Sequence, residues 1–184
     1  GTYLIKVSSS KLSQAESEEA TMLLKVIGDY ERISDHAVNI LESAEELRDK
    51  KLSLSEEALK EYKTLAKAID EILTLSETAF VRADTQMAAN VEPLEQVVDY
   101  MKDRFRTNHI LRMQKKQCSV EVGFVWSDLL TNLERVSDHC SNIAGCVIDN
   151  AEHNLNLHET LKKARDDSEQ YQMAYEGYMA KYGM

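Results

Sequence analysis

One decapeptide occurs twice in this chain in nearly the same form. Glu31-Arg-Ile-Ser-Asp-His-Ala-Val-Asn-Ile40 recurs 103 residues later as Glu134-Arg-Val-Ser-Asp-His-Cys-Ser-Asn-Ile143, and seven of the ten positions are identical. A charged and polar string has no packing reason to recur so closely. The repeat therefore predicts two copies of one structural unit, and a task carried out by Glu, Asp, His and Asn at fixed helical spacing.

The composition predicts an all-α fold. The 184 residues include six Gly and one Pro, and 43% of them are hydrophobic, which favours helices over a sheet. Apolar positions at helical spacing predict helices over 12–47, 56–82, 84–116, 120–151 and 157–182. Ser55, followed by two Glu residues, is typical of an N-cap, as is Asp84, and Pro93 suits a first turn or a kink. Short connections predict antiparallel neighbours.

The repeat offset divides the chain into two units of unequal completeness. The apolar stripe of helix 120–151 has the same angular positions as that of helix 12–47, whereas most of the counterpart of helix 84–116 would lie before Gly1. We therefore expect tandem three-helix bundles: 84–184 as a complete unit, and 1–83 as a unit lacking most of its leading helix. A chain that begins in this way is expected to be a fragment, and its open first bundle to self-associate.

Charge and cysteine content narrow the class of protein. A net charge of −10 argues against binding to nucleic acid or anionic lipid and fits cations or a basic partner surface. No run of about 18 apolar residues is present, so no membrane span is expected. Three cysteines without disulfide or zinc spacing suit a reducing, cytosolic setting.

Two carboxylate pairs lie within the decapeptides. Glu31 and Asp35, like Glu134 and Asp138, are four residues apart and so share a helix face, nearly opposite the apolar stripe. Such a pair is repulsive unless a positive group compensates it, and a divalent cation with hard oxygen ligands, such as Mg, Mn, Fe or Ca, could do so. The alternative is a salt bridge, because the Arg that follows each Glu reaches the Asp at i+3.

Glu95 and Asp99 form a third pair of the same spacing. Lys102 and Arg106 share their helix face and could neutralise them, which favours the salt-bridge interpretation. The exception is a structure in which this pair meets the carboxylates of the second decapeptide across a helix interface. Four facing carboxylates would form a cage for two or more cations.

The remaining polar positions of the decapeptide are interpreted as structural. His36 and His139 lie nearer the core than the acidic face, so we expect them to make hydrogen bonds at the bundle edge rather than bind metal. The two Asn residues either orient the carboxylates or bind across to a neighbouring helix. Because Leu24, Ile27 and Val38 flank the first acidic face, we expect another helix, from a partner chain or from the missing leading segment, to cover it, and the second face to be the wetter one.

The doubled string Glu-Arg-Ile/Val-x-Asp-His-x-x-Asn-Ile resembles the signature of PhoU, the phosphate-signalling regulator. Other parts of the chain resemble more closely the PhoU-like domain at the cytoplasmic end of bacterial sodium/phosphate cotransporters. These parts are Asn108-His109-Ile-Leu-Arg112, Cys118, Gly123-Phe124, Asp128-Leu-Leu-Thr-Asn-Leu-Glu134, and the tail with Tyr175, Tyr178 and Lys181-Tyr182.

The resemblance implies two three-helix bundles. It also implies cation clusters held by Glu/Asp-x-x-x-Asp motifs, which in some PhoU proteins bind iron or zinc. In this chain the expected cation is Fe, Zn, Mg or Mn. The implied metal ligands are Glu134, Asp138, Glu95, Asp99, Glu31 and Asp35. Because the partner motif of the first copy would lie before Gly1, the second copy is the preferred site.

The resemblance also implies a function. The leading hypothesis is a non-enzymatic regulatory domain of a sodium-dependent phosphate cotransporter, at the cytoplasmic face of the bacterial plasma membrane, with the transmembrane part of the same transporter as partner. The alternative is a free-standing PhoU-type adaptor that acts on a phosphate ABC transporter and a histidine kinase. A carboxylate-bridged dimetal enzyme is a third hypothesis, but no Glu-x-x-His pair aligns with the acidic motifs, and the sequence has no phosphate loop or Ser/His/Asp set.

Overall fold

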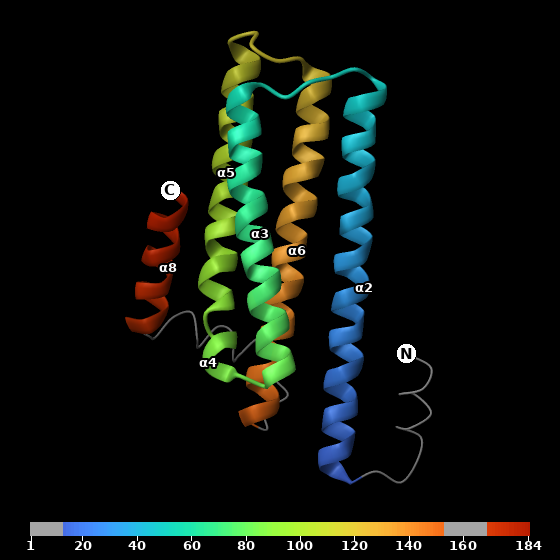
Figure 1. The fold of residues 1–184 in the computed structure, drawn as a ribbon, viewed down its shortest axis with the longest axis vertical. Helices are drawn as coiled ribbons and strands as arrows, with labels where there is room; N and C mark the ends of the chain where they lie inside the picture. Colours follow the sequence, from blue (N-terminus) through green and yellow to red (C-terminus); the bar gives the residue numbers. More distant parts are fainter. Residues whose placement is uncertain (1–12, 153–168) are drawn as a thin grey trace.

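The computed structural model describes residues 13–152 and 169–184, and all the regular structure in these ranges is helical (Figure 1). The all-α fold predicted from the composition is confirmed. The helices are α2 (Gln14–Asp49), α3 (Glu56–Arg82), α4 (Thr85–Ala88), α5 (Val91–Gln114), α6 (Val120–Glu152) and α8 (Glu169–Tyr182). Of the helix predicted over 157–182, the part before residue 169 lies outside the described residues.

Side-chain caps fix where the first two helices begin. At the start of α2, the Ser13 hydroxyl accepts the Glu16 N–H, while the Glu16 carboxylate accepts the Ser13 N–H at 2.8 Å. At the start of α3, the Ala58 N–H donates to Ser55 Oγ at 3.2 Å, which confirms the predicted cap. Each cap satisfies a backbone donor that has no partner within its helix.

The helix predicted over 84–116 is divided in two. Ala83 ends α3 in the left-handed region with φ 50°, and Asp84 then caps the single turn of α4 by accepting the Met87 N–H. The chain turns again at Asn90, and α5 begins at Val91. Pro93 is therefore in the first turn of α5, where the missing N–H costs no hydrogen bond.

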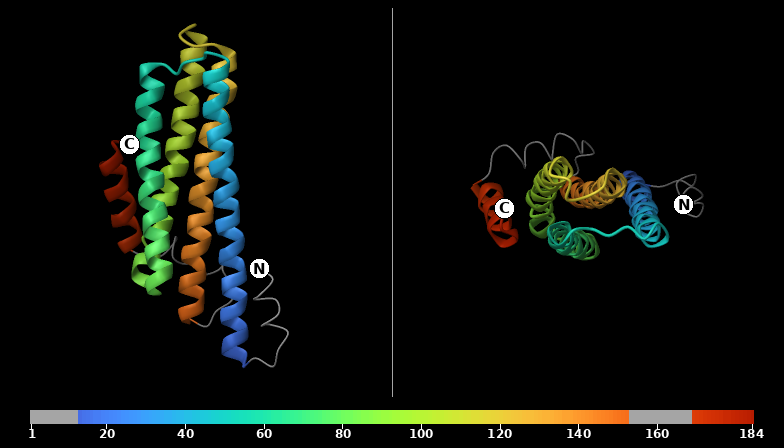
Figure 2. Two further views of the ribbon diagram at one scale, coloured as in Figure 1. Left: turned by 45° about the vertical axis from the view of Figure 1, so that its right-hand side comes forward. Right: turned by 90° about the horizontal axis from the view of Figure 1, so that it is seen from above.

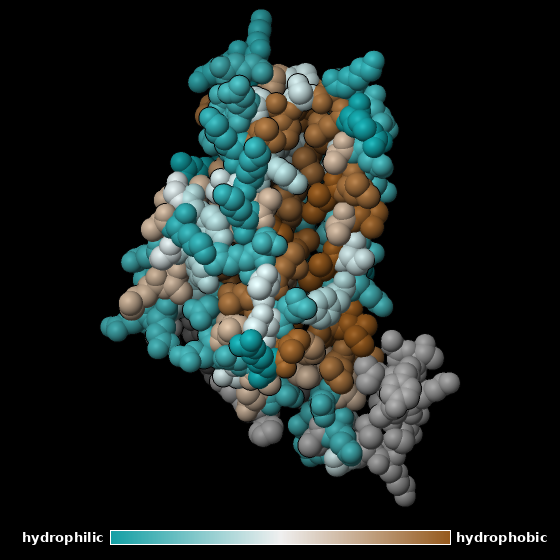
Figure 3. All heavy atoms as spheres, viewed as in Figure 1, coloured by the Kyte–Doolittle hydropathy of each residue, from teal (hydrophilic) through white to brown (hydrophobic). Residues whose placement is uncertain are grey.

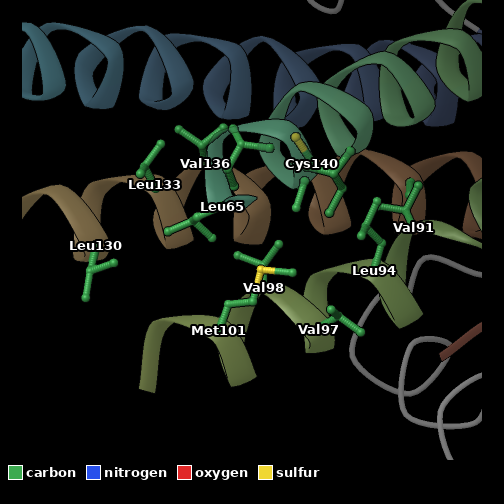
Figure 4. Close-up of a cluster of buried hydrophobic side chains, with 14 of the residues drawn as sticks. Leu65, Val91, Leu94, Val97, Val98, Met101, Leu130, Leu133, Val136 and Cys140 are labelled. Atoms are coloured by element: carbon green, nitrogen blue, oxygen red, sulfur yellow. The ribbon is translucent and has the colours of Figure 1, made fainter. Parts of the chain in front are cut away.

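Helices α3, α5 and α6 enclose the main core. Their apolar faces meet in a continuous cluster that includes Leu65 of α3, Val98 of α5 and Leu130 of α6 (Figure 4). None of these three side chains is more than 1% exposed. Truncation of a Leu at such a position costs about 2–5 kcal/mol, so this cluster is a main source of stability.

Helix α2 packs lengthwise and antiparallel against α6, and α8 packs against the outer side of α5 (Figures 1 and 2). Helix α3 belongs by sequence to the first expected unit, 1–83, but it packs on α5 and α6 of the second unit. The division into 1–83 and 84–184 remains a prediction.

On the face of the molecule that Figure 1 shows, a band of apolar side chains lies between α2 and α3 (Figure 3). Among the described residues, no helix is both long and apolar enough to cross a membrane.

Candidate functional site: a paired decapeptide and a carboxylate cluster

The two decapeptides face each other across the interface of α2 and α6. His36 of the first copy stacks on His139 of the second, with ring centroids 5.7 Å apart and planes 29° from parallel. The offset of the repeat makes these two histidines equivalent positions. The copies are therefore paired by a local pseudo-twofold axis between the two antiparallel helices.

Two hydrogen-bonded networks flank this stack. Asp29 Oδ1 lies 2.8 Å from His139 Nδ1 and accepts from Asn142 Nδ2 at 3.3 Å. On the other side of the axis, Asn132 Oδ1 lies 2.8 Å from His36 Nδ1 and accepts from Asn39 Nδ2 at 3.0 Å. The His and Asn positions of the motif thus fasten α2 to α6. The prediction of edge hydrogen bonds for the histidines is confirmed, and the Asn residues bind across to the neighbouring helix.

Sequence reasoning missed the acceptors of these bonds. Asp29 and Asn132 are separated by the offset of the repeat and so are equivalent positions, but they lie outside the decapeptide and differ in charge. Their common property is an oxygen that accepts from a His and an Asn of the opposite helix. A comparison of the positions that precede each copy would have found the pair.

The carboxylates of the first copy point away from the interface of α2 and α6. Glu31 is exposed, and Asp35 lies 3.7 Å from Arg32 Nη1 with both side chains more than two-thirds exposed. Val38 beside them is 51% exposed. No helix of the described residues covers this face, because α2 presents to α6 the opposite part of its circumference, and cover by a helix from outside these residues stays a prediction. The salt-bridge interpretation describes this pair.

The carboxylates of the second copy meet the third pair across the interface of α5 and α6. Lys102 Nζ lies 2.9 Å from Glu134 Oε1 and 3.1 Å from Asp99 Oδ1, so one ammonium bridges the two helices. Arg135 Nη1 donates to Asp138 Oδ2 at 2.8 Å, which is the predicted i+3 salt bridge. Glu134 is only 7% exposed, so the second face is the covered one, contrary to expectation.

Glu95 is the least compensated acid of this cluster. It is 7% exposed, and its carboxylate accepts one hydrogen bond, from Gln96 Nε2 at 2.7 Å. Burial raises the pKa of Glu95 to about 8, and the negative charges of Glu92, Asp99 and Asp138 add to the rise. A carboxylate held at this pKa is one that a cation would stabilise in its charged form.

The donor chemistry of the cluster suits a hard cation, but its arrangement does not yet form a site. Among the residues that the structure describes, no three His, Cys, Asp or Glu side chains are placed to hold a metal ion. The reason is visible in the distances, because Lys102 Nζ occupies the position between Asp99 and Glu134. A cation at this place would have to displace that ammonium.

Comparisons with known proteins give the family. The PhoU domain family matches residues 2–44 and 62–147, which include both decapeptides and the Glu95 pair. A phosphate-specific transport system accessory protein PhoU homolog 1 from Thermotoga maritima is 31% identical over 147 residues, 80% of this chain and 62% of the relative. A PhoU homolog of the same description from Deinococcus radiodurans is 25% identical over 126 residues, 67% of this chain and 56% of the relative. No solved structure matches the chain significantly.

The chain belongs to the PhoU domain family, and it spans less than two-thirds of the length of these two relatives. One prediction needs correction. The expected partner, the transmembrane part of a sodium/phosphate cotransporter, is wrong, because the relatives are accessory proteins of a phosphate-specific transport system. The same finding favours the adaptor alternative over the cotransporter domain.

Proposed function

We propose that this chain acts as a regulatory accessory protein of a phosphate-specific transport system, at the inner face of the cell membrane, without a catalytic reaction of its own. The observation that carries the proposal is the family match over both decapeptides, together with the two relatives that bear this description. The transporter it acts on is a phosphate ABC transporter, and its signalling partner is a histidine kinase.

The paired decapeptides suit such a role. Two polar networks and a stacked His pair hold α2 on α6, so a displacement of one copy would alter contacts that the other copy makes. The carboxylate cluster on the far side of α6 shares the helix of the second copy. A ligand that reorders α5 against α6 can therefore alter the surface that α2 presents.

We further propose that this ligand is a cation held by Glu95, Asp99, Glu134 and Asp138. The supporting observation is Glu95, a buried acid whose pKa is raised and whose carboxylate has one donor. Iron, zinc, magnesium or manganese would supply positive charge in place of Lys102, which would turn towards solvent. Glu31 and Asp35 have no facing pair in the described ranges and are not part of this proposal.

The function is tested in the source organism. An in-frame deletion of the segment that encodes residues 1–184 is expected to uncouple phosphate uptake from external phosphate, as measured with radiolabelled phosphate and a starvation-responsive reporter. Complementation with the wild-type segment should restore the response. Unchanged uptake and an unchanged reporter after deletion would contradict the proposal.

The same strains test the role of the cluster. Replacement of Glu134 and Asp138 by Gln and Asn keeps their shape but removes two charges, and is expected to impair the phosphate response. The matched control is the equivalent replacement of Glu31 and Asp35, which are exposed and should tolerate it. Equal effects of the two replacements would contradict a role of the carboxylate cluster in the phosphate response.

A further inference from the structure

A cavity of about 340 Å³ lies between the C-terminal half of α5 and the first turns of α6, at the end of the bundle opposite α4. Its wall is mostly apolar and includes Ile110, Met113, Val120 and Phe124. Val120 and Phe124 are 65% and 69% exposed, so the cavity opens to solvent through apolar side chains. The volume is within the range of small-molecule sites, which begins at about 300 Å³.

One cation lines this cavity, and it has no counter-ion. Arg106 is partly buried, its Nε is buried without a hydrogen-bond partner, and its one bond is a long contact of 3.4 Å from Nη2 to Thr131 Oγ1. Across the described ranges, no carboxylate forms an ion pair with it. An uncompensated, partly buried guanidinium is costly, so its place in the fold calls for an anion from outside.

The two largely buried cations beside Arg106 on α5 do have counter-ions, whereas the exposed Arg104 has none among the described residues. One turn earlier, Lys102 is paired with Asp99 and Glu134. Two turns later, Arg112 is paired with Glu61 through two bonds of 3.0 and 2.7 Å. In a chain with net charge −10, acidic partners are abundant, and yet the cation beside the cavity has none.

The floor of the cavity adds a second polar signal. His109 is 3% exposed, stacks on Trp126 with centroids 6.0 Å apart, and has a buried Nδ1 without a hydrogen-bond partner in the described structure. Its Nε2 lies 3.7 Å from Cys118 Sγ. When the thiol donates to Nε2, the ring proton is on Nδ1, so the two unpartnered nitrogens near the cavity are both donors. An apolar enclosure with unpaired donors and a cation selects an apolar ligand with an anionic end.

We propose that this cavity binds a small amphipathic anion, such as a medium-chain carboxylate, with its apolar body against Phe124, Ile110 and Met113 and its charged group on Arg106. The proposed site is separate from the carboxylate cluster, whose members Glu95 and Asp99 lie in the N-terminal half of α5. It assigns to the domain a ligand that is neither phosphate nor a metal.

The single tryptophan of the chain provides a direct readout, because Trp126 is in the cavity wall. The probe is 2-bromodecanoate below its micelle concentration, since bromine quenches indole fluorescence on contact. We expect saturable quenching, reversal by decanoate, and at least about tenfold weaker competition by 1-decanol, which lacks the charge. Absence of saturable quenching, or equal competition by the acid and the alcohol, would overturn the proposal.

Matched variants separate the site from general charge effects. Arg106→Met is expected to weaken binding by at least about tenfold, because it removes the charged hydrogen-bond donors. Arg104→Met removes the same charge from the exposed face of α5 and should leave affinity within about twofold. Equal losses in both variants would overturn the assignment of Arg106.

A second variant tests the cavity itself. Ser127→Phe places a ring in the cavity and leaves Arg106 in place, so quenching should disappear while the far-ultraviolet circular dichroism stays helical. Retained quenching in this variant would place the ligand elsewhere. Quenching by brominated lipid vesicles but not by monomeric 2-bromodecanoate would instead indicate a membrane surface and would contradict the proposal.

Discussion

His36 and His139 stack across the interface of α2 and α6, and they are the same position of the two decapeptides. Their partners are also equivalent, because Asp29 serves His139 and Asn132 serves His36. The repeat in the sequence is therefore a contact in the structure. Its histidines and asparagines recur because each copy needs the other, while its carboxylates recur on the opposite side of each helix.

The first prediction concerns Asp29. Asp29→Ala leaves His139 and Asn142 without their acceptor in a partly buried interface, and should lower the free energy of unfolding by about 2–3 kcal/mol. Urea unfolding followed by circular dichroism measures this. The control is Asp35→Ala, which breaks only an exposed salt bridge and should cost less than about 1 kcal/mol. Similar losses of stability in the two variants would contradict the role of Asp29 as an acceptor in the α2–α6 interface.

The second prediction concerns pH. The pKa of Glu95 is raised from 4.5 to about 8, so between these values the folded protein keeps a proton that the unfolded chain has lost. Its contribution to stability is therefore complete below pH 4.5 and is lost as the pH rises to about 8. Relative to Glu95→Gln, the wild type should lose on the order of 3 kcal/mol between pH 5 and pH 8.5. Parallel pH profiles of the two proteins would contradict the raised pKa.

The third prediction concerns Lys102. Lys102→Met removes the ammonium between Glu134 and Asp99 and leaves the buried Glu134 with the longer 3.8 Å contact to Arg135 Nε, which should cost about 3 kcal/mol in metal-free buffer. If the cluster accepts a cation, Mn²⁺ or Zn²⁺ should recover stability in this variant, and an equal ionic strength of K⁺ should not. Thermal unfolding with and without each ion measures this. Equal recovery by K⁺ would indicate charge screening instead of a site.

The fourth prediction concerns the ion pair between α3 and α5. Glu61 accepts two bonds from Arg112 and one from Asn108 at 2.8 Å, and both members of the ion pair are nearly buried. Arg112→Met should cost about 3 kcal/mol, because it leaves a buried carboxylate without its cation. Lys50→Met, which breaks an exposed i,i+4 pair with Glu46, should leave the free energy of unfolding almost unchanged in the same urea titration. A cost for Arg112→Met as small as that control would contradict the buried pair.

The helices could be predicted from the sequence because their signals are local. Ser55 caps α3 as expected, and the predicted boundaries of α3 and α6 differ from the observed ones by at most a residue. The end of α3 at Arg82 and the cap at Asp84 agree with the sequence-based prediction. The second break, at Asn90 between α4 and α5, could not be predicted, because Asn90 makes no side-chain cap hydrogen bond that would mark a new helix start.

Periodicity predicts which acidic side chains share a helix face, but not what lies opposite them in the fold. The spacing of Glu134 and Asp138 shows that they share a face, but it does not show which helix covers that face. The structure brings α5 there, with Glu95 and Asp99, and brings α6 to the seam face of α2. The second face was expected to be the wetter one, yet Glu134 on it is 7% exposed, because flanking apolar residues were a weaker guide than the position of a whole helix.

We propose that the two copies of the decapeptide differ in their ability to bind a cation. Both fasten α2 to α6, but within residues 13–152 and 169–184 only Glu134 and Asp138 face a second carboxylate pair. The direct measurement is elemental analysis of protein purified without a metal-affinity tag. We expect bound metal in the wild type and in Glu31→Ala/Asp35→Ala, and its loss in Glu134→Ala/Asp138→Ala. Metal that is absent from the wild type, or retained when Glu134 and Asp138 are removed, would contradict it.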